Sequence, residues 1–254
     1  MDPSGGLQHP GEHHFARRMT RPMVPDCASV AAVDAPNEVT DRLTQRRHGA
    51  DHHYALGMPE FTWRPANEAA SEDVEAVFEA GGARKCCCQV LKVPGWIWRD
   101  TTQEERDAAL MEQAGCGTSG PTSGLVGYVD GEPAGWVAVE PRENYPRIWA
   151  RQKSWMRMDP DLEGVWSVTC FVVRKDFRRQ GLMYELAAAT VEYGRQVGAR
   201  VLEGYPTEPA PGKTVIWDEA SVGLVQVFLD AGYEVEASPT LRRRVVRHRL
   251  GASR

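Results

Sequence analysis

Long apolar runs are missing from this chain: none approaches the length of a membrane-spanning helix, and the N-terminus lacks the apolar core of a secretion signal. A disulfide framework is also missing, because three of the six cysteines are consecutive and adjacent residues do not easily reach separate partners. These absences favour a protein that works in the reducing cytoplasm and does not bind a membrane.

An excess of positive charge is absent as well. The 35 acidic residues outnumber the 30 basic ones and give a net charge of −5, which argues against a general nucleic-acid-binding protein. Basic residues do gather in TLRRRVVRHRL, residues 240–250. We expect this segment to be a basic strand whose arginines decorate an exposed edge, although one of them could reach the phosphates of a ligand.

Large apolar residues are few in residues 1–57, which instead hold six of the seven histidines and many Pro, Gly, Asp and Arg residues. No hydrophobic periodicity is sustained there. We therefore predict a disordered tail over residues 1–57 and one folded domain over residues 58–254.

The stretch from Trp166 to Pro206 shows the clearest pattern. The run SVTCFVV at residues 167–173 is rich in β-branched and aromatic residues, which is typical of a buried strand. A charged turn, RKDFRRQG, ends at Gly181, and apolar residues then recur at helical spacing from Leu182 until Gly198, where a helix would stop. Residues 200–204 begin a second strand.

The turn before the predicted helix has the features of an anion site. The first amides of a helix have no intrahelical partners and carry partial positive charge. Gly181 would let phosphates approach the backbone, and Arg178 and Arg179 add full charges. This turn contains neither G-x-G-x-x-G nor GK[ST], so its pattern indicates a pyrophosphate site of another kind.

At these residues the sequence resembles the GNAT (Gcn5-related) N-acetyltransferase superfamily, whose central motif is Arg/Gln-x-x-Gly-x-Gly/Ala between a strand and a helix. The matching residues are Arg178, Arg179, Gln180, Gly181, Leu182 and Met183. Met183 departs from the small residue usual in the family. The resemblance implies that this turn holds the pyrophosphate of acetyl-coenzyme A, the co-substrate, and that Phe171, Val172 and Val173 pair with its pantetheine arm.

The resemblance also implies a fold. It is an α/β (α+β) fold, the GNAT acyltransferase fold, with a mixed, mostly antiparallel central sheet flanked by helices. Other segments keep the family's order: a strand, a turn and a helix from Phe61 to Gly82, a hairpin around Asp130-Gly131, and a helix over residues 221–231. The resemblance thus spans about residues 60–250.

Acetyl transfer to an amine requires a neutral amine, a stabilised oxyanion and a route for the departing thiolate. The family resemblance implies that the amide of Val172 or Val173 polarises the thioester carbonyl. An alkylamine with a pKa near ~10.4 is mostly protonated at neutral pH, so a base or a water relay is expected.

The candidate bases are Glu203 and Glu140, because both lie where the family splits its sheet; a structural role is the alternative for each. Phe228 occupies the place where the family often has a tyrosine acid. The thiolate would then be protonated by solvent, by Tyr205 or by Tyr233.

The consecutive cysteines Cys86, Cys87 and Cys88 suggest zinc, with Cys116 or Cys170 as further ligands, but the usual spaced pairs are absent. We therefore expect buried or edge-strand thiols and no metal. Cys170 could in principle form an acyl-cysteine, although a small buried residue is the favoured interpretation. Two tryptophans, Trp96 and Trp98, either line an acceptor pocket or pack as core aromatics.

These observations predict an acyl-coenzyme A-dependent N-acyltransferase that moves acetyl to a primary amine of a small molecule by direct attack in a ternary complex. Two alternatives remain open: an acyltransferase that acts on a protein amine, and a degenerate, non-catalytic acyl-coenzyme A-binding module. A homodimer is a further expectation from the resemblance.

Overall fold

The structure is a computed structural model that describes residues 59–79, 85–151, 162–209, 212 and 220–251. All of these residues belong to one compact unit, Leu56–Arg254. The predicted tail at residues 1–57 lies outside the described residues, so its disorder and the start of the folded domain at residue 58 stay predictions.

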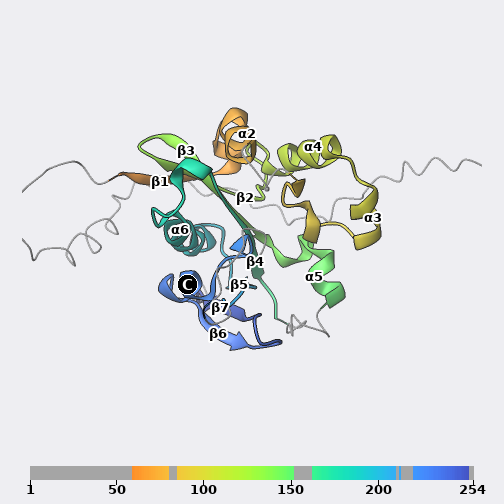
Figure 1. Cartoon of the computed structure of the whole chain (residues 1–254), viewed down its shortest axis with the longest axis vertical. Helices are drawn as coiled ribbons and strands as arrows, with labels where there is room; N and C mark the ends of the chain where they lie inside the picture. Colours follow the sequence, from red (N-terminus) through yellow and green to blue (C-terminus); the bar gives the residue numbers. More distant parts are fainter. Residues whose placement is uncertain (1–58, 80–84, 152–161, 210–211, 213–219, 252–254) are drawn as a thin grey trace, which may run out of the picture. The chain divides into compact units, whose positions relative to one another are not determined.

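A seven-stranded sheet forms the centre of this unit (Figure 1), in the order β1-β2-β3-β4-β5-β7-β6. Only β4 and β5 are parallel; all the other neighbours are antiparallel. This confirms the predicted mixed, mostly antiparallel sheet. The strands are β1 (Phe61–Pro65), β2 (Gly124–Val129), β3 (Glu132–Pro141), β4 (Val165–Val173), β5 (Val201–Gly204), β6 (Glu234–Ala237) and β7 (Val245–Arg249).

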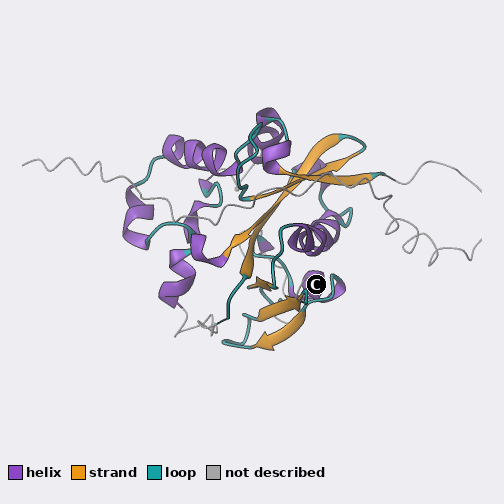
Figure 2. Cartoon of the chain, turned by 180° about the vertical axis from the view of Figure 1, so that it is seen from behind, coloured by secondary structure: helices purple, strands orange, loops and turns teal. Residues whose placement is uncertain are grey.

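Helices lie on both sides of the sheet, as Figure 2 shows. The α-helices are α2 (Ser71–Glu79), α3 (Gly95–Asp100), α4 (Gln103–Ala114), α5 (Pro146–Arg151), α6 (Leu182–Gln196) and α8 (Val225–Asp230). Short 3₁₀ helices are η2 (Ala66–Glu68), η4 (Gln89–Leu91), η5 (Arg142–Asn144) and η7 (Lys175–Phe177). Among the described residues, no helix is long and apolar enough to cross a membrane.

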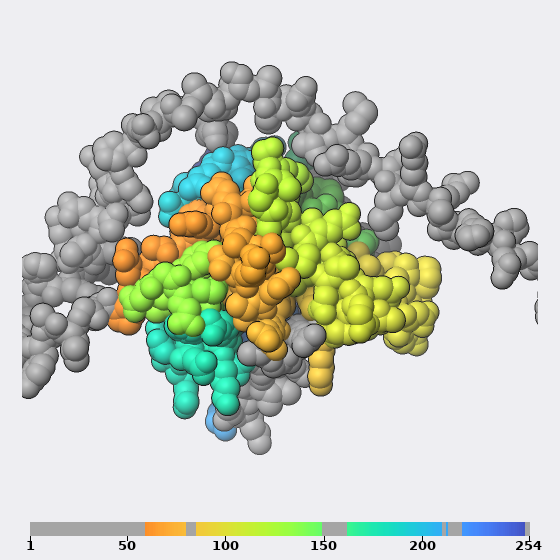
Figure 3. Space-filling view, turned by 90° about the horizontal axis from the view of Figure 1, so that it is seen from above, coloured from red at the N-terminus to blue at the C-terminus, as the bar shows by residue number. Residues whose placement is uncertain are grey.

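The alternation of side chains along β3 divides the core into two layers. Val137 and Val139 belong to the apolar cluster beneath α6, whereas Trp136 and Ala138 belong to the cluster beneath α2 and α4. This is the period of two expected of a strand that is buried on both faces. In Figure 3 the orange surface of α2 lies beside the yellow-green surface of α4, and a cavity of about 340 Å³ between them is lined by residues of both helices.

Local interactions define the predicted hairpin and the start of helix α4. Asp130 and Gly131 take positive φ values of 50° and 80°, as a tight hairpin turn requires. Helix α4 begins with a capping box, in which the hydroxyl of Thr102 accepts the amide of Glu105 and the Glu105 carboxylate accepts the amide of Thr102.

The prediction of an exposed basic edge strand near the C-terminus was wrong. Strand β7 lies inside the sheet, between β5 and β6, and its residues Val245, Val246 and Arg247 are buried. The reason is electrostatic: the guanidinium of Arg247 meets the carboxylates of Glu203 and Glu236 on the two neighbouring strands, so the charge is neutralised inside the sheet.

The helix predicted over residues 221–231 is shorter than expected and starts at Val225. Gly223, at φ 85°, has a left-handed conformation that a helix does not contain. A Cβ at this position would lie 2.5 Å from the Phe228 ring, so the glycine also lets the chain pass close to that side chain.

The sheet opens between its two parallel strands, and this opening positions the site. β4 and β5 pair only from Val165 opposite Val201 to Val168 opposite Gly204. Beyond that point β5 ends, while β4 continues along β3 to Val173. We call this opening the fork.

Candidate functional site

The basic turn after β4 has the position and the form that the sequence predicted. After η7 the chain turns through Arg179, at φ 63°, and Gly181, at φ 84°, before α6 begins. The Arg178 Nε atom donates to the carbonyl of Val173 over 3.1 Å, and the Gln180 amide donates to the carbonyl of Asp176 over 2.9 Å. These bonds tie the turn back to the strand that precedes it.

The start of α6 is open. Gly181 is the N-cap residue and no side chain caps the helix there. A Cβ on Gly181 would meet no atom within 4 Å, so the space above its backbone is free. The first amides of α6 therefore face outward with the positive end of the helix dipole, which is the arrangement that binds phosphate.

A cavity of about 420 Å³ runs from this turn to the fork. Seven of the nine residues predicted to bind the cofactor line it, the exceptions being Val172 and Gln180. Val172 instead packs against Trp136 in the cluster beneath α2 and α4. The lining residues are Phe171, Val173, Phe177, Arg178, Arg179, Gly181, Leu182, Met183, Tyr184, Ala220, Ser221, Leu224 and Val227.

Backbone amides along the open part of β4 point alternately into the fork and toward β3. The amide of Phe171 donates to the carbonyl of Ser221 over 2.6 Å, on the fork side, whereas the amide of Arg174 donates to Ala134 on β3. Because amides two residues apart point the same way, Val173 directs its amide into the fork. Of the two predicted oxyanion donors, Val173 therefore has the suitable orientation and Val172 does not.

An aromatic plug closes the inner end of the fork. The ring of Phe228 packs edge-on against Phe171 and Tyr233, at centroid distances of 5.6 and 5.0 Å. The Tyr233 hydroxyl shares a hydrogen bond of 2.7 Å with Thr190 of α6, and burial raises its pKa. The hydroxyl of Tyr233, one of the predicted acids, therefore points toward α6.

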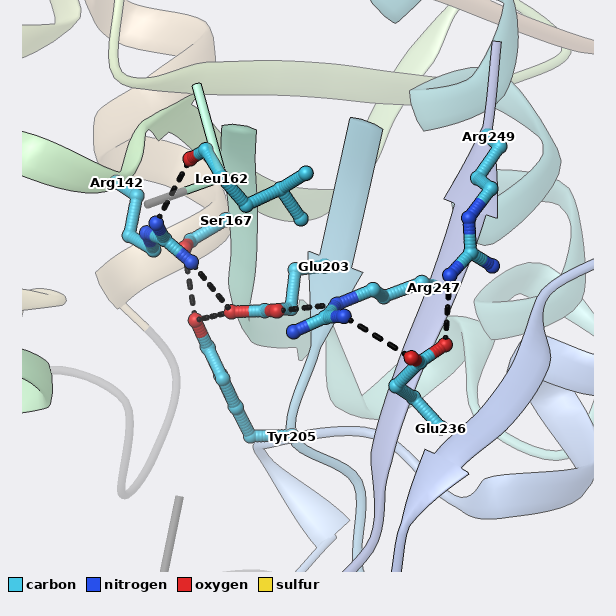
Figure 4. A network of polar contacts seen from close by, with 8 residues as sticks. All are labelled: Arg142, Leu162, Ser167, Glu203, Tyr205, Glu236, Arg247 and Arg249. Atoms are coloured by element: carbon cyan, nitrogen blue, oxygen red, sulfur yellow. Dashed lines mark hydrogen bonds and ion pairs between the residues drawn. The ribbon is translucent and has the colours of Figure 1, made fainter. Parts of the chain in front are cut away.

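Two of the three predicted catalytic residues, Glu203 and Tyr205, share one buried polar network, which we call the Glu203 network (Figure 4). The Glu203 carboxylate lies between the guanidinium groups of Arg142, at 3.5 Å, and Arg247, at 2.7 Å. It also accepts the Tyr205 hydroxyl over 2.7 Å, and that hydroxyl lies 3.0 Å from the hydroxyl of Ser167. Since an ionised carboxylate only accepts, Tyr205 donates to Glu203 and Ser167 donates to Tyr205.

The Glu203 network crosses the sheet from its core to its surface. Arg142 also donates to the carbonyl of Leu162, over 3.0 Å. On the other side, Glu236 of β6 bridges Arg247, at 3.2 Å, and Arg249, at 2.9 Å. Burial, and next the Glu203 carboxylate, raise the pKa of Tyr205 well above its usual value, so Tyr205 stays protonated at neutral pH.

The third predicted residue, Glu140, belongs to a second buried group, the Glu140 network. Its carboxylate lies 2.5 Å from the Lys92 ammonium and accepts the Asn144 amide over 2.7 Å. The Tyr145 hydroxyl interacts with it as well, and Thr169 of β4 donates to that hydroxyl over 3.1 Å. Burial, followed by the Glu140 charge, raises the pKa of Tyr145 well above its usual value.

The two networks have the same plan. Each begins at a hydroxyl of β4, Ser167 or Thr169, passes through a buried tyrosine and ends at a buried glutamate. Sequence reasoning found the glutamates and Tyr205 but missed Tyr145, Ser167 and Thr169. No local signal could have found them, because Tyr145 and Thr169 are 24 residues apart in the chain and meet only in the folded sheet.

The consecutive cysteines do not gather around one point. Cys87 donates to a carboxylate oxygen of Asp107 over 2.9 Å, whereas Cys88 contacts Cys170. Within the ranges that the structure describes, no group of three or more His, Cys, Asp or Glu side chains is placed to hold a metal ion.

Trp96 and Trp98 do not pack in the core. Trp96 is 65% exposed. Trp98 is half-buried, and the Arg106 guanidinium stacks 4.0 Å above its ring. Neither tryptophan lines the cavity at the fork.

Residues 90–210 match the model of the acetyltransferase (GNAT) family. No curated protein matches the chain. Similar solved structures include yncA from Salmonella typhimurium with its cofactor acetyl-CoA, which is 16% identical, covers 75% of this chain and 94% of its own, and has a TM-score of 0.42.

Two further similar structures are both N-acetyltransferases. One, from Staphylococcus aureus Mu50, is 13% identical, covers 76% of this chain and 99% of its own, and has a TM-score of 0.43. The other is PaiA from Thermoplasma acidophilum in complex with coenzyme A. It is 11% identical, covers 75% of this chain and 99% of its own, and has a TM-score of 0.44.

Proposed function

We propose that the chain, whose residues 90–210 match the model of the acetyltransferase (GNAT) family, transfers acetyl from acetyl-coenzyme A to a primary amine of a small molecule. The observation that carries this proposal is the cavity of about 420 Å³ that joins the uncapped start of α6 to the fork. One end of the cavity suits an anion, and the other end is bounded by apolar side chains and strand amides.

The residues of the cavity fit acetyl-coenzyme A in three parts. The amides at Gly181, Leu182 and Met183, with the charges of Arg178 and Arg179, would hold the pyrophosphate. The Phe171 amide is taken by the Ser221 carbonyl, so the edge of β4 at Val173 would hold the pantetheine arm as an added strand does, with Phe171 lining the cavity beside it. The thioester would then lie at the fork, where the Val173 amide points and could donate to the carbonyl oxygen.

The reaction forms a C–N bond and breaks the C–S bond, so one proton must leave the amine and one must reach the thiolate. We propose that the amine's proton leaves toward the hydroxyls of β4 that begin the two networks, with Glu140 and Glu203 as candidate acceptors and Tyr205 as a proton carrier. Glu140 is the better placed of the two carboxylates, because one ammonium group balances it whereas two guanidinium groups hold Glu203.

Binding is tested first, by a thermal-shift titration of the full chain with acetyl-coenzyme A. A ligand that binds only the folded protein stabilises it by about 2.7 kcal/mol at a hundredfold excess over its Kd. Gly181→Glu places a carboxylate at the anion site and should abolish the shift. Gly198→Glu is the matched control: Gly198 has a similar positive φ of 72°, has open space around it and follows the other end of the same helix.

Turnover is tested next, by release of free coenzyme A thiol in the presence of a panel of primary amines. Glu140→Gln and Glu203→Gln should lower the rate without changing the shift given by acetyl-coenzyme A. Binding without turnover on any amine would favour the non-catalytic binding module. Turnover only on peptides or proteins would favour a protein amine as acceptor. No shift in the folded parent protein would contradict the proposal itself.

The proposal also covers the cellular location and the assembly of the protein. The cytoplasm is the proposed location, and it is supported by the free thiols of Cys86, Cys87, Cys88, Cys116 and Cys170. A homodimer is the proposed assembly, which sedimentation of the purified chain over a range of concentrations would test.

A further inference from the structure

The thiols of Cys88 and Cys170 meet between the turn that precedes η4 and the central strand β4. Cys88 is 6% exposed, and Cys170 is partly buried against the same apolar cluster. The two thiols interact within this cluster, although the cysteines are 82 positions apart in the sequence.

A β-bulge turns Cys170 toward Cys88. Ala138 pairs with Cys170 whereas Val139 pairs with Val168, so β4 carries one extra residue, Thr169, at this point. Strict alternation would place Cys170 on the α6 side of the sheet with Val168. The bulge instead places it in the cluster beneath α2 and α4. Bulges often re-aim a side chain in this way next to a functional site.

The backbone on the other side of the contact is also unusual. Cys87 and Cys88 have φ values of 43° and 57°, the left-handed region that residues other than glycine rarely adopt. Strained residues of this kind concentrate at functional positions. The turn separates the two neighbouring thiols, since Cys87 bonds to Asp107 of α4 while Cys88 meets β4.

We propose that Cys88 and Cys170 form a redox-sensitive modification site, which a hydroperoxide converts into an intramolecular disulfide. Cys170 is the thiol that is partly exposed, so its sulfur attacks hydrogen peroxide first. The O–O bond breaks, the thiol becomes a sulfenic acid and one water leaves. The Cys88 sulfur then attacks the sulfenic sulfur, the S–O bond breaks and a second water leaves. The two thiols lose two electrons and two protons in total, which the peroxide takes up.

The environment of Cys88 suits this order of events. The hydrogen bond to Cys170 and burial raise the pKa of Cys88, so it remains a neutral thiol that does not react with peroxide directly. The Cys88 thiol lies beside the Cys170 thiol, with which it reacts in the second step. The proposal concerns the thiols alone and does not depend on what the cavity at the fork binds.

The test uses peptide mapping of the full chain after treatment with hydrogen peroxide. Remaining thiols are blocked, and the unfolded protein is digested with trypsin without reduction. Cleavage after Lys85 and Lys92 gives residues 86–92, and cleavage after Arg157 and Arg174 gives residues 158–174. We expect these two peptides to be joined by a disulfide that a reductant breaks.

Because residues 86–92 contain all three consecutive cysteines, serine variants identify which of them reacts. The cross-linked pair should persist in Cys86→Ser and Cys87→Ser and disappear in Cys88→Ser and Cys170→Ser. Its absence from the peroxide-treated parent, or its loss in Cys87→Ser, would overturn the proposal. The parent and Cys87→Ser decide the matter even if Cys88→Ser does not fold.

Discussion

The Tyr205 hydroxyl donates a hydrogen bond of 2.7 Å to the Glu203 carboxylate, two residues earlier on the same face of the chain. Both side chains are buried, and the carboxylate is balanced by Arg142 and Arg247 from outside its own strand. This arrangement joins β4, β5 and β7 at the closed end of the fork. It predicts effects on stability that are separate from any effect on catalysis.

Replacing Glu203 by glutamine should destabilise the protein by about 3–5 kcal/mol, because it leaves two buried guanidinium groups facing a neutral amide. Urea denaturation of the parent and the variant measures this loss. The matched control is Glu132→Gln, which removes the partner of Arg174 from an ion pair whose glutamate is 58% exposed. That pair should contribute less than about 1 kcal/mol. Equal losses in the two variants would contradict the structural role of the Glu203 network.

Alkaline pH should destabilise the folded chain through its buried tyrosines. Burial and a neighbouring glutamate raise the pKa of Tyr145 and Tyr205 above the value of about 10 that they have when unfolded. The unfolded chain therefore releases these protons first. The stabilising contribution is complete below about pH 10 and is lost as the pH rises toward the folded pKa.

Each such tyrosine should remove ~1.4 kcal/mol of stability per pH unit in that window. Urea denaturation at a series of alkaline pH values should show a smaller slope in Tyr205→Phe than in the parent. Tyr184→Phe, at a tyrosine that is 41% exposed, should leave the slope unchanged. A slope that is the same in all three proteins would show that Tyr205 ionises as readily in the folded chain as in the unfolded one.

At Arg179 in the basic turn, a substitution can weaken ligand binding without changing the stability of the fold. This residue has a φ of 63°, which glycine adopts without strain. Arg179→Gly should therefore fold as stably as the parent, yet bind acetyl-coenzyme A about tenfold more weakly, through the loss of one charge-assisted contact of roughly 1.5 kcal/mol. Calorimetric titration gives the Kd.

Arg200→Gln serves as the control for net charge, since Arg200 is 64% exposed and follows the other end of α6. Its Kd should match that of the parent at moderate salt. If the two variants bind equally well, Arg179 contributes nothing to the anion site.

The sequence alone was sufficient for the features that depend on neighbouring residues. The hairpin at Asp130-Gly131 and the basic turn before α6 each follow from turn chemistry or helical periodicity within a few positions. The family motif lies in one such turn. For this reason most of the residues predicted to bind the cofactor do line the cavity.

Strand order could not be predicted in the same way, and the errors follow from it. The segment at residues 240–250 was predicted to be an exposed edge strand because basic residues often decorate such edges. Glu203, 44 residues away, becomes the partner of Arg247 only because β7 lies beside β5. The pairing of Arg142 with Glu203 spans 61 residues, and the bulge that aims Cys170 depends on the register between β3 and β4. No local pattern determines these long-range contacts.

The inner wall of the fork depends on a contact between Gly204 and Phe228. A Cβ on Gly204 would lie 2.5 Å from the nearest carbon of the Phe228 ring, closer than two carbons can approach. Gly204→Ala should therefore cost about 1–3 kcal/mol, because the ring is held by Phe171 and Tyr233 and cannot easily move away.

A double-mutant cycle shows whether this close contact is the cause. Phe228→Leu shortens the side chain and makes room for the added methyl group. The double variant should therefore lose less stability than the two single variants lose together, by at least about 0.5 kcal/mol. Urea denaturation of all four proteins provides the comparison. Strict additivity would contradict the close contact as the cause and would mean that the plug at the fork has space for a larger residue beside it.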